Sequence, residues 1–430
     1  MSSILSMRFL RITQPMKYYG SHAICGSTTA QQSNYASQAV VHCKSHRRVY
    51  GSSEHPNMRI VICAVLYGRG GTETHLLHLC RLLAERGHEV TIACRYANRS
   101  VPLVQQSKAL GMKRLSTPFD HNKAYYRWST IAALLLWPWY LARHPADVII
   151  TLERSRFLRF LKRFLRPGGF ILLLRAGLPT NPSEAFDPQI MALLDGVFTE
   201  SPLQADASAD AYPSLPVLGI PLLGNISTNI EARPAHKNIT DPVRIAYMGR
   251  YDRKKGIFRL FDIWPSLAYA NLRLDFYGHG GEKDTLLHEI TRLGYTESMA
   301  VHDGWDKPEQ LTALMSNIDL LILPSEEEGL PVILMEAMAH GVPFVATDIG
   351  AVGTYAQDNP DVRVVPLNNH LIAAAILEMV ELIRGGQING ERLQRYYADR
   401  YAYNKLAKQW LDAIENAENW VNSHSDRVLI

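Results

Sequence analysis

The sequence contains few cysteines, and their spacing excludes two common kinds of small scaffold. Its 430 residues include five cysteines, none of which forms a Cys-x-x-Cys pair. An odd number without such pairs argues against both a disulfide framework and a zinc ribbon. Cys63 and Cys94 lie within apolar runs, where we expect them to be core residues. This use of cysteine is typical of a protein that works in the reducing cytosol.

Long apolar runs and a strong charge imbalance are also missing. No apolar run reaches the ~18 residues that a membrane-spanning helix needs. The nearest one, Ile131–Ala142, is interrupted by Pro138. The formal net charge is +4, and the isoelectric point is near 8.7. Such a weakly basic balance does not imply nucleic-acid binding. We therefore expect a cytoplasmic protein that at most contacts the cytoplasmic face of the inner membrane.

The chain is long enough for several domains, and it begins with a segment of different composition. A domain typically has ~100–200 residues, so a chain of this length with 47% hydrophobic residues indicates two or three domains. Residues 1–57 are rich in serine, glutamine, tyrosine and histidine and show no hydrophobic period. We interpret them as a disordered leader, or as sequence upstream of a natural start at Met58. An organellar transit peptide is the alternative.

An alternation of strands and helices begins at Met58. Met58–Ala64 is a continuous apolar run of the kind found in buried parallel strands. A glycine-rich turn at Tyr67–Gly71, a helical period over 72–86 and a strand at Glu89–Cys94 follow. This unit is typical of the start of a doubly wound sheet. Further strands of this first series are expected at Asp147–Thr151, Phe170–Leu174 and Gly196–Thr199.

A polar linker near 232–242 separates this first series from a second one. Strands of the second series are expected at Val243–Met248, Leu272–Tyr277, Asp319–Leu323 and Pro343–Ala346. Helices are expected at 257–267, 282–293, 331–340, 367–385 and 401–420. The two series predict an α/β protein with Rossmann-like domains at 58–235 and 242–400 that face a central cleft. Ligands of open α/β sheets bind at the carboxyl ends of the strands, so the loops there are the candidate site.

Two glutamates follow one of these strands, in the segment PSEEEGLPVILMEAMAHG (324–341). Glu328 lies in the loop, and Glu336 lies in a helix whose other residues from Pro331 to Ala339 are apolar. An unpaired carboxylate is costly to bury, so we expect Glu336 to meet a partner at the cleft. A solvent-facing Glu336 is the alternative. Gly329 permits close approach of a ligand, and the amides at the helix start, near Leu330, suit hydroxyl or phosphate oxygens.

Two further loops contain residues suited to binding an anion. The segment GRYDRKKG (249–256) follows the strand Val243–Met248 and contains Gly249, Arg250 and Lys255. Fixed cations stabilise the negative charge of a departing diphosphate. A solvated basic turn is the alternative. The segment GRGG (68–71) follows the first strand and leads into His75, although a glycine-rich loop alone is a weak indication.

These segments resemble family-4 retaining glycosyltransferases, which have the GT-B fold. The residues 328–348 match the family's pair of glutamates separated by seven residues, with its EG-P-LEAMA-G-P-V-ATD context. The segment 249–256 is similar to the family's GR-L----KG element, and 70–75 is similar to its GG-E-H turn. The resemblance extends over roughly residues 58–420, and it implies that the helical segment 401–430 crosses back to the first domain.

The resemblance also implies roles for individual residues. Glu328 would hold the transferred sugar near its reacting carbon, and Glu336 would bind the ribose. Arg250 and Lys255 would bind the diphosphate, which agrees with a metal-independent enzyme without a cofactor. The remaining donor-site residues would be Gly249, Gly329, Leu330, Gly70 and Gly71.

The acceptor side of the site departs from the family's pattern. Many relatives carry a histidine or aspartate after the strand Phe170–Leu174, where this chain has Arg175. Arg175 is a candidate for binding a carboxylate or phosphate of the acceptor. His75 is a second candidate on this side, and a helix-capping or core histidine is its alternative. Thr354 also replaces a glutamate of the family's pattern, so the sequence does not specify the sugar or the nucleotide.

A basic stretch at 154–166, RSRFLRFLKRFLR, contains no acid. A helix of this sequence would place its phenylalanines and leucines on one side and its basic residues on the other, which suits an anionic membrane surface. The alternative is an ordinary helix whose apolar face packs on the sheet. Residues 131–140 add an aromatic-rich segment in the same domain. Contact with a membrane would present a lipid-linked or cell-envelope glycan acceptor.

The sequence therefore predicts a retaining glycosyltransferase that moves a hexose-type sugar from a nucleotide sugar to a hydroxyl of a glycan or lipid-linked acceptor. Synthesis of cell-envelope polysaccharide or lipopolysaccharide is the expected setting. One rival is a GT-B nucleotide-sugar 2-epimerase, which needs acid–base carboxylates near the second sugar carbon. The other is a non-enzymatic binder of anionic surfaces.

Overall fold

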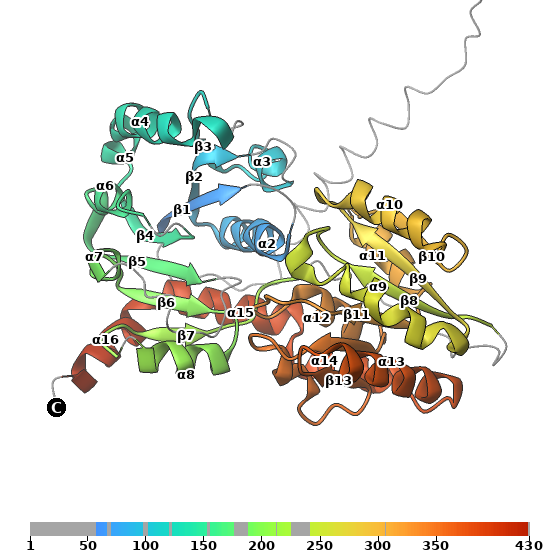
Figure 1. Ribbon diagram of the computed structural model, residues 1–430. Coiled ribbons are helices and arrows are strands. Elements are labelled where there is room, and N and C mark those ends of the chain that lie inside the picture. The colour runs from blue at the N-terminus through green and yellow to red at the C-terminus, as the bar shows by residue number, and fades with distance from the viewer. Residues whose placement is uncertain are drawn as a thin grey trace, which may run out of the picture. The chain divides into compact units, whose positions relative to one another are not determined.

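The computed structural model describes residues 57–66, 70–97, 102–119, 123–152, 155–175, 188–211, 213–224, 241–305 and 307–428. These residues form two parallel sheets, one in each half of the chain (Figure 1). The predictions for the leader 1–57 and for most of the linker therefore lie outside the described residues. No helix within the described ranges combines the length and the apolar character that a bilayer crossing requires.

The first sheet has seven strands in the order β3-β2-β1-β4-β5-β6-β7. Its strands are β1 (Arg59–Leu66), β2 (Glu89–Ala97), β3 (Lys113–Leu115), β4 (Ala146–Thr151), β5 (Leu165–Arg175), β6 (Gly196–Thr199) and β7 (Val217–Gly219). Its helices of four or more residues are α2 (Gly71–Arg86), α3 (Pro102–Gln106), α4 (Tyr126–Leu136), α5 (Pro138–Arg143), α6 (Leu158–Lys162), α7 (Pro188–Met191) and α8 (Pro202–Ala211).

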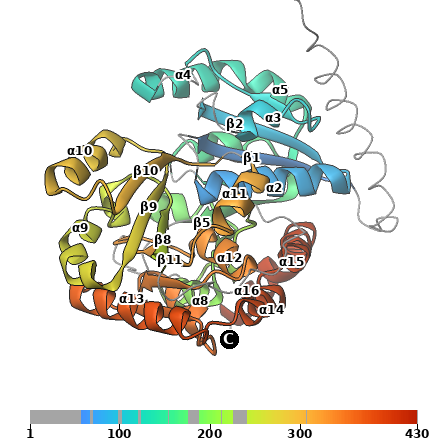
Figure 2. The ribbon, with the colours of Figure 1, turned by 90° about the vertical axis from the view of Figure 1, so that its right-hand side faces the viewer.

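Strand β1 is buried on both faces, as its continuous apolar sequence predicts. Ile60 and Ile62 pack with Leu76 and other residues of α2, whereas Val61 and Cys63 belong to a separate cluster with α4, α5 and α6. The helices therefore cover the sheet from both sides, with α2 opposite α4 and α5 (Figure 2). This arrangement leaves the carboxyl ends of the strands open for a site.

The second sheet has six strands in the order β10-β9-β8-β11-β12-β13. Its strands are β8 (Val243–Met248), β9 (Leu272–Gly278), β10 (Met299–Asp303), β11 (Leu320–Leu323), β12 (Phe344–Thr347) and β13 (Val362–Val365). Its helices are α9 (Arg259–Ile263), α10 (Lys283–Leu293), α11 (Pro308–Met315), α12 (Val332–Ala339), α13 (Asn369–Arg384) and α14 (Gly390–Arg400). Both sheets are parallel throughout, as two successive βα series predict.

The last two helices, α15 (Tyr403–Glu415) and α16 (Ala417–Val428), pack against the first sheet and its helices. The indole of Trp410 is fully buried, 4.6 Å from the ring centroid of His75, and its Nε1 donates to the carbonyl of Pro221 at 2.9 Å. Glu415 forms an ion pair with Arg86 at 3.0 Å, and its Oε1 lies within hydrogen-bond distance of His88 Nε2, also at 3.0 Å. The end of the chain thus returns from the second domain to the first.

The predicted helix at 154–166 is wrong in its extent, whereas the burial of its apolar face agrees with the alternative of an ordinary helix that packs on the sheet. The helix here, α6, has five residues, and the chain enters β5 at Leu165. Phe157, Leu158 and Leu161 are buried in the core beneath the first sheet. Much of the apolar side of this stretch packs on the protein, with Phe160 and Phe164 half-buried, and the exposed side chains at 155–166 are basic.

Candidate active site

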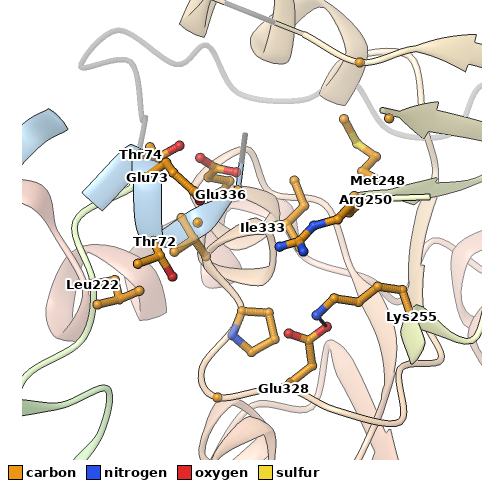
Figure 3. Close-up of a pocket in the computed structure, with 18 of the residues that line it drawn as sticks. Thr72, Glu73, Thr74, Leu222, Met248, Arg250, Lys255, Glu328, Ile333 and Glu336 are labelled. Atoms are coloured by element: carbon orange, nitrogen blue, oxygen red, sulfur yellow. Dashed lines mark ion pairs between the residues drawn. The ribbon is translucent and has the colours of Figure 1, made fainter. Parts of the chain in front are cut away.

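A cavity of about 620 Å³ lies at the carboxyl ends of the strands and is lined by both domains. The first domain contributes residues from α2, the end of β6 and the segment near Leu222. The second contributes the loops after β8, β9, β10 and β11 together with α12. Figure 3 shows side chains of both domains around this cavity, among them Arg250, Lys255 and Glu328.

Arg250 is the first side chain of the loop after β8, and two tyrosines hold this loop. The hydroxyl of Tyr247 donates to the Arg250 carbonyl at 2.6 Å. The Tyr251 hydroxyl lies 2.8 Å from the Phe276 carbonyl oxygen and 2.6 Å from that of His302, and these two acceptors share its one proton. Burial, together with the nearby Glu328 carboxylate, raises the pKa of Tyr247 well above its usual value. Both tyrosines therefore stay neutral donors, and Arg250 is held at the cavity by a rigid loop.

Lys255 ends a short 3₁₀ helix (Arg253–Lys255), which a side-chain cap and a following glycine place beside the loop after β11. The Asp252 side chain accepts from the Lys254 amide at 3.0 Å. Gly256 follows with φ of 67°, and a Cβ there would collide with the carbonyl of Pro324. This close approach requires glycine. Lys255 Nζ consequently reaches the loop after β11 and donates to the Glu327 carbonyl at 3.1 Å.

Glu328 accepts two interactions on one carboxylate oxygen, Oε1. Lys255 Nζ lies 2.7 Å from it, and the hydroxyl of Ser325 donates to it at 2.7 Å. Two further hydrogen bonds fix this loop. Thr347 Oγ1 donates to the Ser325 carbonyl at 2.6 Å, and the Ala351 amide donates to the Gly329 carbonyl at 2.9 Å. The Glu328 side chain is 10% exposed. A charged, oriented carboxylate thus lies at the cavity wall beside the cations.

Glu336 lies in α12 and lines the same cavity, although it is only 4% exposed. The residues around it in the helix are buried core residues, as the apolar sequence predicts. Its carbonyl accepts from the His340 amide at 3.2 Å. The helix thus places one carboxylate toward the cavity while its other faces pack inside the second domain.

The glycine loop of the first domain approaches the second domain closely. A Cβ at Gly70 would lie 3.3 Å from Arg250 Nη2, and a Cβ at Gly71 would lie 3.3 Å from a methyl carbon of Val332. Glycine at both positions lets the start of α2 come near the cations and the start of α12. The first domain therefore forms one wall of the cavity beside Arg250.

All residues predicted for catalysis or donor binding line this one cavity: Arg250, Lys255, Glu328, Glu336, Gly249, Gly329, Leu330, Gly70 and Gly71. His75 does not. Its ring is fully buried, its Nδ1 accepts from the Leu223 amide at 3.0 Å, and burial lowers its pKa to about 3. His75 is therefore a neutral core histidine, which was the stated alternative. The side chain of Arg175 lies outside the described residues.

Glu200 lines the cavity, and the sequence prediction missed it. It directly follows β6, is 3% exposed, and its Oε2 accepts from the Leu330 amide at 2.6 Å. This contact joins the two domains at the start of α12. The only sequence indication is a carboxylate after a strand end, which many surface loops share. Among the described residues, no group of three histidines, cysteines, aspartates or glutamates has the arrangement of a metal site.

The fold and the site together define the GT-B class of glycosyltransferases. The sequence matches two family models, "Glycosyltransferase Family 4" over residues 69–170 and "Glycosyl transferases group 1" over 229–415. These two ranges cover most of the two domains. The chain belongs to the family-4 type of GT-B glycosyltransferases, a class of enzymes.

Similar proteins support the same assignment. The putative teichuronic acid biosynthesis glycosyltransferase TuaC of Bacillus subtilis is 31% identical over 153 residues, which are 36% of this chain and 37% of that protein. The match thus spans little more than a third of the relative's length. Sucrose-phosphate synthase of Thermosynechococcus elongatus superimposes with a TM-score of 0.67 at 17% identity, over 82% of this chain and 97% of the other. HepE of Anabaena, solved with UDP and glucose, gives 0.64 at 15% identity, over 84% and 100%. At these identities the structures show the fold alone.

Proposed function

We propose that this protein transfers a hexose-type sugar from a nucleoside-diphosphate donor to a hydroxyl acceptor with retention of configuration. The observation that carries the proposal is the convergence of Arg250, Lys255, Glu328 and Glu336 on one cavity between the domains. Two fixed cations suit the diphosphate, and two carboxylates suit hydroxyl groups of the sugar and the ribose. The cavity volume of about 620 Å³ falls within the range of pockets for small ligands.

In the proposed reaction, the bond between the anomeric carbon and the diphosphate oxygen breaks while the acceptor oxygen bonds to the same face of that carbon. The electron pair leaves with the diphosphate, whose added negative charge Arg250 and Lys255 stabilise. Glu328 stabilises the positive charge that develops on the sugar. The acceptor hydroxyl gives its proton to the departing diphosphate, so the step needs no further base.

We propose that the reaction proceeds without a divalent metal ion. The side chains of Arg250 and Lys255 supply positive charge at the cavity wall, which is the task of a metal in other nucleotide-sugar enzymes. Transfer should therefore persist at an unchanged rate in excess EDTA. A rate that falls in EDTA and recovers with Mg²⁺ or Mn²⁺ would refute this part of the proposal.

The proposed acceptor is a hydroxyl of a glycan or of a lipid-linked glycan in polysaccharide synthesis. The support is the similarity to TuaC, whose name places that protein in teichuronic acid biosynthesis. Cell-envelope polysaccharide or lipopolysaccharide is the class of product that we propose.

Incubation of the purified protein with a panel of nucleotide sugars and glycan acceptors tests the proposed function. Mass spectrometry should detect a product heavier by one hexose, and NMR should show the anomeric configuration of the donor. The Glu328→Ala variant should lose transfer while it keeps its thermal unfolding temperature. Inversion of configuration, or a variant that transfers at the wild-type rate, would refute the mechanism. Conversion of the donor alone into its 2-epimer would instead establish the epimerase.

A further inference from the structure

The first domain exposes a concentrated apolar surface that the site does not use. Seven of the twelve large apolar side chains that are exposed among the described residues lie between 125 and 139. We call the α4–α5 surface the following six of them: Trp128, Ile131, Leu134, Leu135, Leu136 and Trp139. Leu135 is 75% exposed and Trp139 is 68% exposed. Single exposed apolar residues are common, whereas such a cluster marks an interaction surface.

Helix α4 is more apolar toward solvent than toward the core. At ~100° per residue, Trp128, Ile131 and Leu135 fall on one stripe of the helix. The opposite side, which is buried, presents Ser129 and Ala133. A helix of an ordinary globular domain shows the reverse pattern. Packing among the residues that the structure describes therefore does not explain the stripe.

Basic side chains flank the α4–α5 surface. Arg127 and Arg143 are exposed at its two ends, and the Arg143 guanidinium lies 4.3 Å from the ring centroid of Trp139. Arg95 joins α4 to the segment before α6, because it donates to Thr130 Oγ1 at 2.6 Å and to Ser155 Oγ at 3.2 Å. The exposed basic residues in and next to α6 are Arg156, Arg159, Lys162 and Arg163.

Few acidic residues accompany these basic ones in α4, α5 and the α6 segment. Between residues 123 and 166, Asp147 is the one acid among the described residues, and Arg166 pairs with it at 2.8 Å. Among the described residues from 123 to 166, basic side chains therefore predominate. An aromatic and aliphatic surface with arginines at its edge suits a layer that is apolar inside and anionic outside.

We propose that the α4–α5 surface docks on the headgroup region of an anionic lipid bilayer. Trp128, Leu135 and Trp139 enter the boundary between headgroups and acyl chains, and the flanking arginines contact the lipid phosphates. In this proposal the pair of helices α4 and α5 binds the membrane, and α6 contributes only its basic side chains. This inference stands on the surface alone and does not depend on the proposed sugar transfer.

A second copy of the chain is a poorer occupant. A symmetric dimer would bring the same surface of both copies together, and so would set one basic rim against the other. Like charges at such an interface oppose association. An anionic bilayer is complementary to both the apolar centre and the basic rim.

Flotation with lipid vesicles tests the proposal. The full chain should float with vesicles of phosphatidylcholine that contain about one-third phosphatidylglycerol, because an anionic surface attracts the basic rim. It should bind vesicles of phosphatidylcholine alone at least about tenfold more weakly, and high salt should reduce the difference. Equal binding to both vesicles, or no binding to either, would overturn the proposal.

Variants locate the contact. The pair Trp128→Ser with Leu135→Ser, and separately the pair Arg127→Glu with Arg143→Glu, should each lower the partition coefficient on anionic vesicles about tenfold or more. The matched control is Tyr269→Ser with Leu287→Ser, which removes exposed apolar side chains from the second domain and should change nothing. Thermal unfolding of each variant checks the fold. An equal loss in the control would contradict the proposal, and so would a wild-type dimer that the first pair dissociates.

Discussion

At the residue scale, the site depends on which cations face the cavity and which do not. Arg250, Arg253 and Lys255 are close in sequence, yet Arg253 lies outside the cavity lining and pairs with Glu282 at 3.0 Å on an exposed surface. Lys255 instead contacts Glu328 at the cavity wall. The position of each charge relative to the substrate, and not the basic composition of the loop, should decide its effect on the reaction.

Arg250→Ala and Lys255→Ala should therefore each lower kcat about a hundredfold or more, because in the proposed reaction each removes a donor that stabilises the leaving diphosphate. Arg253→Ala is the matched control and should keep the wild-type rate. Steady-state kinetics on one nucleotide sugar measures all three. Equal losses in the three variants would show that the loop contributes only through its overall charge.

His75 should affect stability as a function of pH. Burial lowers its pKa from 6.5 to about 3, so the unfolded chain binds this proton at a pH where the folded protein does not. The stabilising contribution is fully present above pH 6.5 and is lost as the pH falls toward 3, by about 1.4 kcal/mol per pH unit. His75→Asn does not titrate, and denaturant unfolding of this variant should depend less steeply on pH over that range. Parallel curves for the variant and the wild type would contradict this assignment.

Sequence patterns identified the site residues whose chemistry is unusual for their position. A glutamate within an apolar helix and a basic loop after a buried strand both indicated function, and both line the cavity. Glu200 gave no such indication, since its partner, the Leu330 amide, is 130 residues away. His75 was ambiguous for a similar reason, because the elements that bury it come from distant parts of the chain.

At the element scale, the start of α2 sets how near the first domain comes to the second. Gly71→Val should lower nucleotide-sugar affinity about tenfold, because a side chain there would press on Val332 and displace the two walls of the cavity. Gly281→Val is the matched control, since a Cβ at Gly281 meets no atom within 4 Å. Calorimetric titration of both variants checks the difference. Wild-type affinity in Gly71→Val would show that the domains do not approach at this point.

The elements with clear sequence signals at both ends could be predicted closely, and those without such signals could not. Strands β6 and β8 have the predicted bounds, since each is an apolar run with clear ends. Strands β3 and β7 have only three residues each, too few to show an alternation. For the segment 154–166 the sequence left two possibilities open, an exposed apolar face and a packed one. A helical period shows that an apolar face exists, but only the fold shows that the sheet covers it.

At the scale of the whole molecule, the C-terminal helices fasten the second half of the chain to the first domain. Trp410 is their main buried anchor, between His75 and Phe198 at ring distances of 4.6 and 4.9 Å. Trp410→Ala should lower the free energy of unfolding by about 3–5 kcal/mol, because it leaves a large cavity. Trp139→Ala, which removes an exposed indole, should change it little. Denaturant titration compares the two, and similar losses would contradict the packing described here.

The central claim is that the cavity between the two domains binds a nucleoside diphosphate through Arg250 and Lys255. Calorimetric titration of the wild type with UDP, GDP and ADP tests it most directly, with Lys255→Ala as the comparison. We predict that at least one of the three binds with a single site, and that its affinity falls about tenfold or more in Lys255→Ala because a charge-assisted contact is lost. The absence of binding to all three, or equal affinity in both proteins, would contradict the claim.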